Sequence, residues 1–292
     1  MKKSLVAALA TSVMAVMLTA PATPATAASA FCNQTTPSTS LLAYNKDTGA
    51  VGTGTLSAGR WHYGSNIDVP DGYTHGVASR DSMLFYNADT GAGESGTFRG
   101  GKYTRVQTYN NFSTGWTHVV ASGESALFYN ADNGQGGTGT LRNGRYHHVR
   151  SYDNFSTGWD SIAASCDTAV FTKSGEVGYG TLKNGLYAHV DARETDADLG
   201  TLVATKDTVL ALAENGSQLQ YRIARATDGK VGGFRDIGTS GVWEEEGRTG
   251  DSLFFYKTDG TAWTSKLSGN AYSNVGPLAG VSSGWSFIAG GV

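Results

Sequence analysis

The sequence repeats a pattern of about 42 residues six times, and this periodicity limits the possible fold more than any other feature. The clearest copies read "LFYN" and begin at Leu84 and Leu127. Related segments begin at Leu42, Val170, Leu210 and Phe254. A large apolar residue lies thirteen positions before the third residue of each copy: Phe31, Tyr73, Trp116, Trp159, Leu199 and Trp243, with Trp285 next in line. Two features that keep one spacing through six copies predict a repeat architecture.

Each unit contains four short segments that are typical of β-strands. In the third unit they read "WTHVVAS", "ALFYNA", "GTGTLRNG" and "RYHHVRSY". Asn143-Gly144 lies between the last two, and Asn184-Gly185 repeats it in the next unit. This dipeptide favours a tight hairpin because both residues accept positive φ angles. Four strands per repeat make one blade of a β-propeller, so we predict an all-β, six-bladed β-propeller.

The two ends of the repeat region predict how the ring closes. The region begins with the strand-like "LLAY" and ends with "GWSFIAGGV", which is the segment that precedes that strand in other units. Pairing of these N- and C-terminal strands would complete one blade and leave no open seam. The alternative is a tandem pair of β-trefoils. We disfavour it because no Gln-x-Trp element recurs and no linker separates the third and fourth units.

The N-terminal segment has the order of a secretory signal peptide. Lys2 and Lys3 precede an apolar run of about 14 residues, which ends before the small-residue pattern Ala28-Ser29-Ala30. This run is shorter than the roughly 20 residues of a membrane span. We expect residues 1–30 to be the signal peptide, 31–40 an N-terminal strap and 41–292 the propeller. The protein would be extracellular after cleavage near Ala30.

Charge and cysteine content narrow the partners and the redox environment. The formal net charge is −3 and the basic residues are scattered, so we expect neither nucleic acid as a partner nor insertion into a membrane. Cys32 and Cys166 are the two cysteines. In an exported protein a disulfide between them is the first expectation, and it would pin the strap over one face of the ring. Two free thiols are the alternative.

The repeat "GWTHVVASGESALFYNADNGQGGTGTL" resembles that of tachylectin-2-like propeller lectins. It is still more similar to repeats of secreted actinobacterial lectin proteins, some of which are lectin subunits of umbrella toxin particles. The resemblance covers residues 41–292 and is strongest in the second and third units. It implies sugar binding without catalysis, with no cofactor. The implied partners are glycans of a cell surface or cell wall and other subunits of a secreted toxin complex. Tachylectin-2 has five blades, so a count of six departs from it.

The hexapeptide "NFSTGW" occurs twice and indicates a candidate binding site. A related pattern, apolar-Ser-[Ser/Thr]-Gly-Trp, appears a third time before Trp285. Two interpretations stay open. The tryptophan packs between blades, as Leu199 in the same position suggests, or the loop contacts ligand, since the polar residues recur in only three units. The candidate carbohydrate-binding residues are Asn111, Phe112, Ser113, Thr114, Trp116, Asn154, Phe155, Ser156, Thr157, Trp159 and Trp285.

Other motifs do not indicate catalysis or a metal site. "GVSSG" at Gly280–Gly284 matches a nucleophile elbow but no His or Asp follows it. The "NADTG" turns lack the spaced ligands of a calcium loop, so we expect Asn- or Asp-capped hairpin turns instead. Glu244–Glu246 either border a solvated channel or hold a cation or basic partner. We therefore predict a secreted, non-enzymatic lectin-like module. The alternatives are a protein–protein interaction scaffold and a secreted glycan-active hydrolase.

Overall fold

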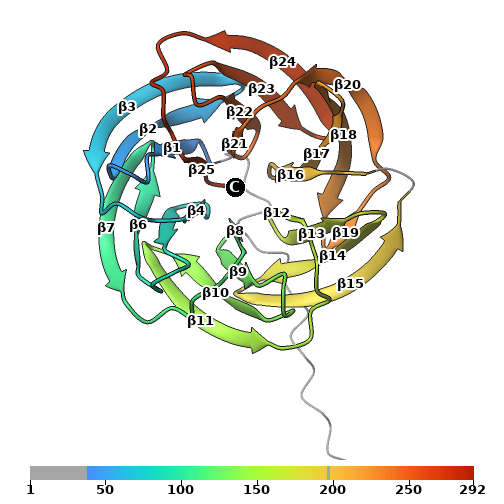
Figure 1. The fold of residues 1–292 in the computed structure, drawn as a ribbon, viewed down its shortest axis with the longest axis horizontal. Helices are drawn as coiled ribbons and strands as arrows, with labels where there is room; N and C mark the ends of the chain where they lie inside the picture. The colour runs from blue at the N-terminus through green and yellow to red at the C-terminus, as the bar shows by residue number, and fades with distance from the viewer. Residues whose placement is uncertain (1–37, 196–197) are drawn as a thin grey trace, which may run out of the picture.

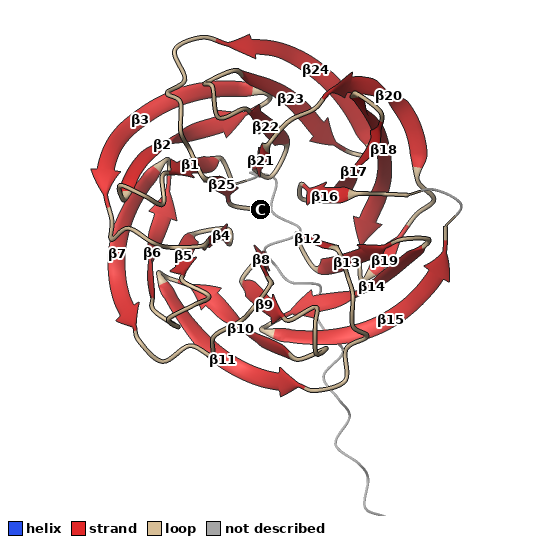
Figure 2. Ribbon diagram, viewed as in Figure 1, coloured by secondary structure: helices blue, strands red, loops and turns tan. Residues whose placement is uncertain are grey.

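A computed structural model of the 292-residue chain describes residues 38–195 and 198–292. Six antiparallel β-sheets, the blades, surround a central axis like the blades of a fan (Figure 1). The described residues form strands, loops and turns and no helix (Figure 2). Accordingly, no helix that could cross a membrane occurs in the described ranges. The predicted six-bladed β-propeller is confirmed, and the tandem trefoil is excluded.

Each blade runs from an innermost strand at the axis to an outermost strand at the rim. Blade 1 consists of β25 (Phe287–Gly290), β1 (Ser40–Tyr44), β2 (Ala50–Ser57) and β3 (Arg60–Asp68). Blade 2 consists of β4 (His75–Ala78), β5 (Ser82–Tyr86), β6 (Gly93–Arg99) and β7 (Lys102–Tyr109). Blade 3 consists of β8 (His118–Ser122), β9 (Ser125–Tyr129), β10 (Gly136–Arg142) and β11 (Arg145–Tyr152).

The second half of the ring follows the same order. Blade 4 consists of β12 (Ser161–Ser165), β13 (Thr168–Lys173), β14 (Glu176–Lys183) and β15 (Leu186–Glu194). Blade 5 consists of β16 (Thr201–Ala204), β17 (Thr208–Asn215) and β18 (Gln218–Thr227), and its outer edge is divided into β19 (Lys230–Val231) and β20 (Arg235–Gly241). Blade 6 consists of β21 (Glu245–Arg248), β22 (Ser252–Tyr256), β23 (Ala262–Ser268) and β24 (Ala271–Leu278).

Blade 1 closes the ring with strands from both ends of the chain. β1 pairs antiparallel with β25, with Leu41 opposite Gly290 and Tyr44 opposite Phe287. The predicted closure by terminal strands is therefore confirmed. Because the first and last strands of the repeat region pair in one sheet, the described ring has no open seam between blades.

Where the second strand of a blade carries the tyrosine of "LFYN", its hydroxyl bonds the loop that leads from that blade to the next. Tyr86, Tyr129 and Tyr256 are fully buried. Their hydroxyls donate to the carbonyl oxygens of Ser113 (2.7 Å), Ser156 (2.8 Å) and Ser282 (3.0 Å). A buried hydroxyl without a partner would cost about 1–3 kcal/mol, so this bond holds the loop as well as the core.

A hydroxyl, in four blades with an adjacent aspartate, connects each outer hairpin to a neighbouring blade. The Asn143 and Gly144 amides donate to the Asp81 carboxylate (3.2 Å) and to Ser82 Oγ (2.8 Å). Asn143 (φ 51°) and Gly144 (φ 75°) form the tight hairpin that their sequence predicts. The hydroxyl contact to a hairpin amide recurs at Ser125, Thr168, Thr208 and Ser252. These contacts make a latch between blades.

The Asn-capped turn that we expected at "NADTG" is present. Asn87 Oδ1 accepts the amides of Asp89 and Thr90, both at 2.9 Å. Its side-chain amide donates to the Gly72 carbonyl oxygen in the loop that enters the blade. The turn therefore serves the fold, as the sequence indicated.

Several expectations fall on residues outside the described part of the chain. They are the signal peptide, most of the strap, and Cys32. Cys166 is buried, with 7 % exposed area, in the turn between β12 and β13, and no described cysteine is free. The pairing of Cys32 with Cys166 stays a prediction.

Candidate functional site

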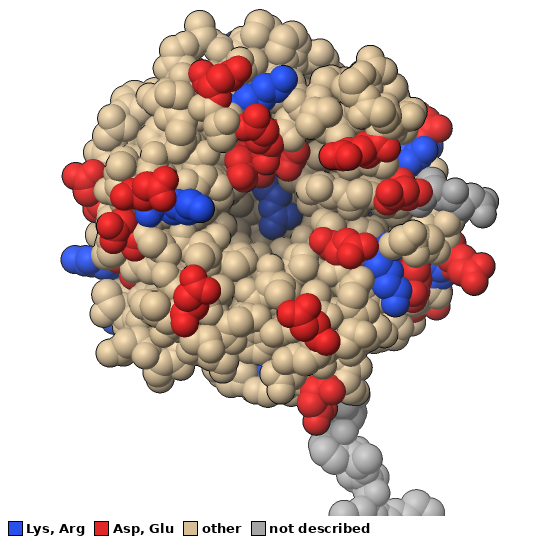
Figure 3. All heavy atoms as spheres, in the orientation of Figure 1, with Lys and Arg blue, Asp and Glu red and all other residues tan. Residues whose placement is uncertain are grey.

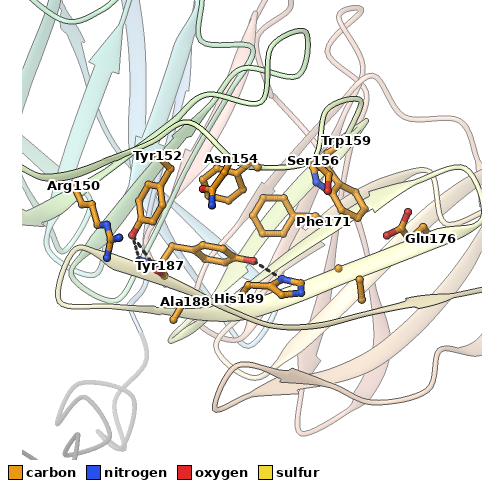
Figure 4. Close-up of a pocket in the computed structure, with 13 residues that line it drawn as sticks. Arg150, Tyr152, Asn154, Ser156, Trp159, Phe171, Glu176, Tyr187, Ala188 and His189 are labelled. Carbon is orange, nitrogen blue, oxygen red and sulfur yellow. Dashed lines mark hydrogen bonds between the residues drawn. The ribbon is translucent and has the colours of Figure 1, made fainter. Parts of the chain in front are cut away.

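Two equivalent pockets lie where the "NFSTGW" loops meet the next blade. The Trp159 pocket, between blades 3 and 4, has a volume of about 550 Å³ (Figure 4). The Trp116 pocket, between blades 2 and 3, has a volume of about 450 Å³. Both volumes are in the range of small-ligand sites. The repeat therefore builds the same cavity twice, one blade apart.

The loop residues form one wall of each pocket, and the strands of the next blade form the rest. Of the candidate residues, Asn111, Phe112, Ser113 and Trp116 line one pocket, and Asn154, Phe155, Ser156 and Trp159 line the other. Thr114 and Thr157 are exposed but do not line the pockets. Trp285 lies in the corresponding loop before blade 1.

Each of these three tryptophans lies against a glycine in the third strand of its blade. A β-carbon at Gly178 would lie 3.0 Å from the Trp159 ring, and one at Gly137 would lie 3.8 Å from the Trp116 ring. At Gly52 the distance to the Trp285 ring would be 3.3 Å. The three blades with the Ser-[Ser/Thr]-Gly-Trp loop are thus the three blades in which glycine faces the tryptophan.

The other three blades have large or charged residues at this glycine position. The strand registers place Glu94, Arg222 and Trp263 there in blades 2, 5 and 6. In blade 6 a cleft of about 460 Å³ remains, lined by Trp243, Trp263, Lys257 and other residues. The residue that faces the loop aromatic is therefore glycine only in the three blades whose loop has the Ser-[Ser/Thr]-Gly-Trp pattern.

The loop phenylalanines pack against the next blade and still border the pockets. Phe112 stacks on Phe128, with ring centroids 5.6 Å apart, and Phe155 lies 5.1 Å from Tyr187. Trp159 is buried to 5 % exposure, whereas Trp116 is partly exposed. Both interpretations of the hexapeptide thus have support in the geometry, because one side of the loop packs and the other faces the cavity.

Sequence reasoning missed a tyrosine and a histidine on the outer strand of each pocket. Tyr146 and His148 line the Trp116 pocket, and Tyr187 and His189 line the Trp159 pocket. Burial raises the pKa of Tyr146 and Tyr187, so both hydroxyls keep their protons at neutral pH. The recurrence of Tyr directly after the outer hairpin was the available signal.

The rim of the Trp159 pocket carries charge that the Trp116 pocket lacks. The Lys173 ammonium lies 4.6 Å from the centroid of the Trp159 ring, and 3.0 Å from the Glu176 carboxylate. The Arg150 guanidinium lies 5.1 Å from the Tyr152 ring on the opposite side. In Figure 4, Arg150 and Glu176 stand at opposite ends of the cavity.

A separate cavity lies on the axis and contains the acidic segment singled out in the sequence. All six innermost strands line it, and its volume is about 410 Å³. Figure 3 shows a central hollow with basic atoms at its bottom and acidic atoms beside it. Glu245 and Glu246 border this channel, as the first of the two interpretations expected, whereas Glu244 does not line it and accepts the Thr258 amide instead. No cluster of potential metal ligands occurs among the described residues.

The charged groups in the channel have perturbed acidity. Burial, with the neighbouring carboxylate as a smaller cause, raises the pKa of Glu246 to about 7, and burial likewise raises that of Glu245 to about 7. Arg248 donates to the carbonyl oxygens of Ala121, Ala164 and Ala204 on three other blades. Small residues at these positions leave room for the guanidinium.

Comparisons with known proteins identify the fold but no family. No known family and no curated protein sequence matches the chain. A "putative 6-phosphogluconolactonase" from Bacteroides uniformis has a similar structure, with a TM-score of 0.53 and 12 % identity over 86 % of this chain and 98 % of that one. A protein of the same name from Bacteroides fragilis gives 0.53 and 10 % over 87 % and 98 %. A chain of a nidogen/laminin complex gives 0.52 and 9 % over 87 % and 98 %.

These similarities support a six-bladed propeller and do not extend to activity. The tachylectin-2-like resemblance is not confirmed by them. The expectation that the protein is not an enzyme is corrected, because solved propellers of the same architecture include proteins named as lactonases. The fold therefore gives no ground for excluding catalysis.

Proposed function

We propose that this protein binds carbohydrate in the Trp116 and Trp159 pockets. The observation that carries the proposal is the coincidence of two features in the same three blades, the Ser-[Ser/Thr]-Gly-Trp loop and the glycine that faces the tryptophan, with a cavity between blades beside two of them. A feature needed only for folding would recur in all six blades. The resemblance of the repeat sequence to those of propeller lectins agrees with this proposal.

The chemistry of the pocket walls suits a sugar ring. Saccharides combine an apolar C–H face with hydroxyls in fixed directions. The aromatic rings supply flat surfaces, and exposed Asn111 and Ser113 supply donors and acceptors at the rim. Asn154 and Ser156 do the same one blade further on. One such open site would bind at about millimolar Kd, or about −4 kcal/mol.

Repetition of the pocket would compensate for weak single-site binding. The two pockets lie on adjacent blades of one rigid ring, so a multivalent glycan surface could occupy both. Linked weak sites can gain a factor of about 10² or more in avidity. The proposed targets are therefore glycans displayed at high density, such as those of a cell surface or cell wall.

A glycan array with pocket variants tests the proposal. Trp116→Ala and Trp159→Ala should each weaken binding of the glycans that the wild type retains, and the double variant should abolish it. Val190→Ser on the exposed face of β15 is the control and should bind like the wild type. A wild-type protein that captures no glycan, or folded tryptophan variants with unchanged retention, would contradict the proposal. Turnover of a retained glycan would favour the hydrolase alternative.

A further inference from the structure

We propose that the ligand of the Trp116 and Trp159 pockets carries a carboxylate, so that the recognised sugar is an acidic one, of the uronic or sialic acid class. This inference rests on the proposed function and names its ligand class. It comes from blade 2, where the protein places a carboxylate of its own in the equivalent position.

Glu94 in blade 2 occupies the strand position that is glycine in blades 3 and 4. Its side chain is completely buried and accepts hydrogen bonds from the hydroxyls of Tyr103 (2.9 Å) and Tyr73 (3.4 Å). The Arg105 guanidinium lies 3.6 Å from the same carboxylate. A buried charge is stable only with such partners, so these three side chains form a built carboxylate site.

The strand register shows which residues replace these partners in the next two blades. Glu94 corresponds to Gly137 and Gly178, which are paired with equivalent phenylalanines on the neighbouring strand. Tyr103 corresponds to Tyr146 and Tyr187. Arg105 corresponds to His148 and His189, each after the same bulge in the outer strand pair. The Tyr103 donor is therefore kept, while Arg105 is replaced by histidine, Tyr73 by tryptophan, and the internal carboxylate is removed.

The Trp116 pocket shows the resulting vacancy most clearly. Tyr146 is 93 % buried, and its hydroxyl has no hydrogen-bond partner among the described residues, although it borders the cavity. A β-carbon at position 137 would lie 3.7 Å from His148 Cε1 and 3.8 Å from the Trp116 ring, without a clash. The space that a glutamate side chain would fill is thus open, and an acceptor brought by a ligand would bond the Tyr146 hydroxyl at the cavity wall.

Charge at the Trp159 pocket agrees with an anionic ligand. Arg150 lines this pocket as an additional cation. Its one acidic lining residue, Glu176, is paired with Lys173 at 3.0 Å, which reduces repulsion of a carboxylate. Neither pocket contains an acidic residue without a cationic partner among its described lining residues.

Matched acidic and neutral sugars test the ligand class. Methyl glucuronide, methyl galacturonide and the methyl glycoside of N-acetylneuraminic acid would be titrated against methyl glucoside and methyl galactoside, with perturbation of the tryptophan indole NMR signals as the readout. We expect at least one acidic sugar to bind about tenfold tighter than the neutral sugars, which is a difference of about 1.4 kcal/mol. Equal or tighter binding of neutral sugars overturns the carboxylate and leaves carbohydrate binding intact. If neither acidic nor neutral sugars bind at tens of millimolar, both the carboxylate inference and the proposed carbohydrate binding are overturned.

Variants that exchange the glutamate between blades provide a second test. Gly137→Glu should fill the Trp116 pocket with its own carboxylate and abolish acidic-sugar binding there, whereas Gly137→Ala, the matched control, should keep most of it. Tyr146→Phe should weaken acidic sugars several-fold. Glu94→Gly should create a site in blade 2, seen as a rise in Tm with millimolar acetate that equal chloride does not produce. If Glu94→Gly does not fold, the comparison of Gly137→Glu with Gly137→Ala still tests the inference. Unchanged binding by a folded Gly137→Glu protein would overturn the inference.

Discussion

At the scale of single residues, Trp116 and Trp159 occupy the same loop position but differ in burial. Trp159 is 5 % exposed and lies tightly on Gly178, whereas Trp116 is partly exposed and lies less closely on Gly137. The same residue type therefore serves packing and the pocket wall in different proportions in the two blades.

This difference predicts unequal stability losses for the two alanine variants. Trp159→Ala should lower the free energy of unfolding by about 3–5 kcal/mol, because it leaves a cavity in the interface between blades. Trp116→Ala should cost clearly less. Urea denaturation followed by circular dichroism measures both. Equal losses would show that exposure does not describe the packing of these rings.

The site residues divide into those that the sequence revealed and those that it did not. The loop residues were found because their pattern recurs unevenly, in three units of six. Tyr146 and His148 were missed because their relation to the pocket depends on strand register and on a bulge between Thr138 and Gly139. Glu94 has no acidic counterpart in the other units, and its partners Tyr73 and Tyr103 become apparent only in the fold.

At the scale of elements, the latch between an acid–hydroxyl pair and a hairpin is a repeated structural unit. Ser82 Oγ accepts the Gly144 amide at 2.8 Å and donates to Asp81 at 2.7 Å. The pair lies on one blade and the hairpin on the next, so the bond adds to cohesion between blades.

We expect Ser82→Ala to destabilise the fold by about 1–2 kcal/mol, because the buried Gly144 amide loses its acceptor. Ser273→Ala on the exposed outer strand β24 is the control and should have almost no effect. The difference in urea midpoint between the two variants measures the latch. A Ser82→Ala midpoint equal to that of the control would mean that water replaces the hydroxyl.

The N-terminal strap carries a prediction at the same scale. Peptide mapping of the unreduced protein should yield one cross-linked peptide that contains Cys32 and Cys166. Alkylation without reduction should leave both cysteines unmodified. Labelling of two thiols per chain would instead support the free-thiol alternative and leave the strap unpinned.

Local elements were predictable because their signals are local. The Asn-Gly hairpins and the Asn-capped turns depend on residues within four positions of one another, and both appear as expected. The latch was not predicted, because its donor and acceptor lie about 60 residues apart, as the separation of 62 between Ser82 and Gly144 shows.

At the scale of the whole molecule, the 42-residue period and the two ends of the repeat region were enough to predict the ring. The charged residues that line its central channel could not be predicted in this way. The innermost strand β21 carries Glu246 and Arg248. The other five innermost strands have apolar or small residues at the two equivalent positions. Arg248 bonds carbonyl groups 44, 84 and 127 residues away, and no pattern in the sequence connects those positions.

The raised pKa of Glu246 gives a prediction about pH and stability. Burial raises this pKa from 4.5 to about 7, so the unfolded chain releases the proton at lower pH than the folded one. Stability should therefore fall as pH rises from about 4.5 to 7. Glu246→Gln should raise Tm by a few degrees at pH 8 and leave it unchanged at pH 4. A gain of the same size at both pH values would show that titration of this group is not the cause.

The central claim is that the pockets formed by the Ser-[Ser/Thr]-Gly-Trp loops are the binding sites. A crystal structure of the protein with a glycan retained on the array tests this most directly. The account predicts a sugar ring against Trp116 and Trp159, facing Gly137 and Gly178, and no sugar at Glu94. A glycan bound in the axial channel beside Glu246, with both tryptophan pockets empty, would contradict it.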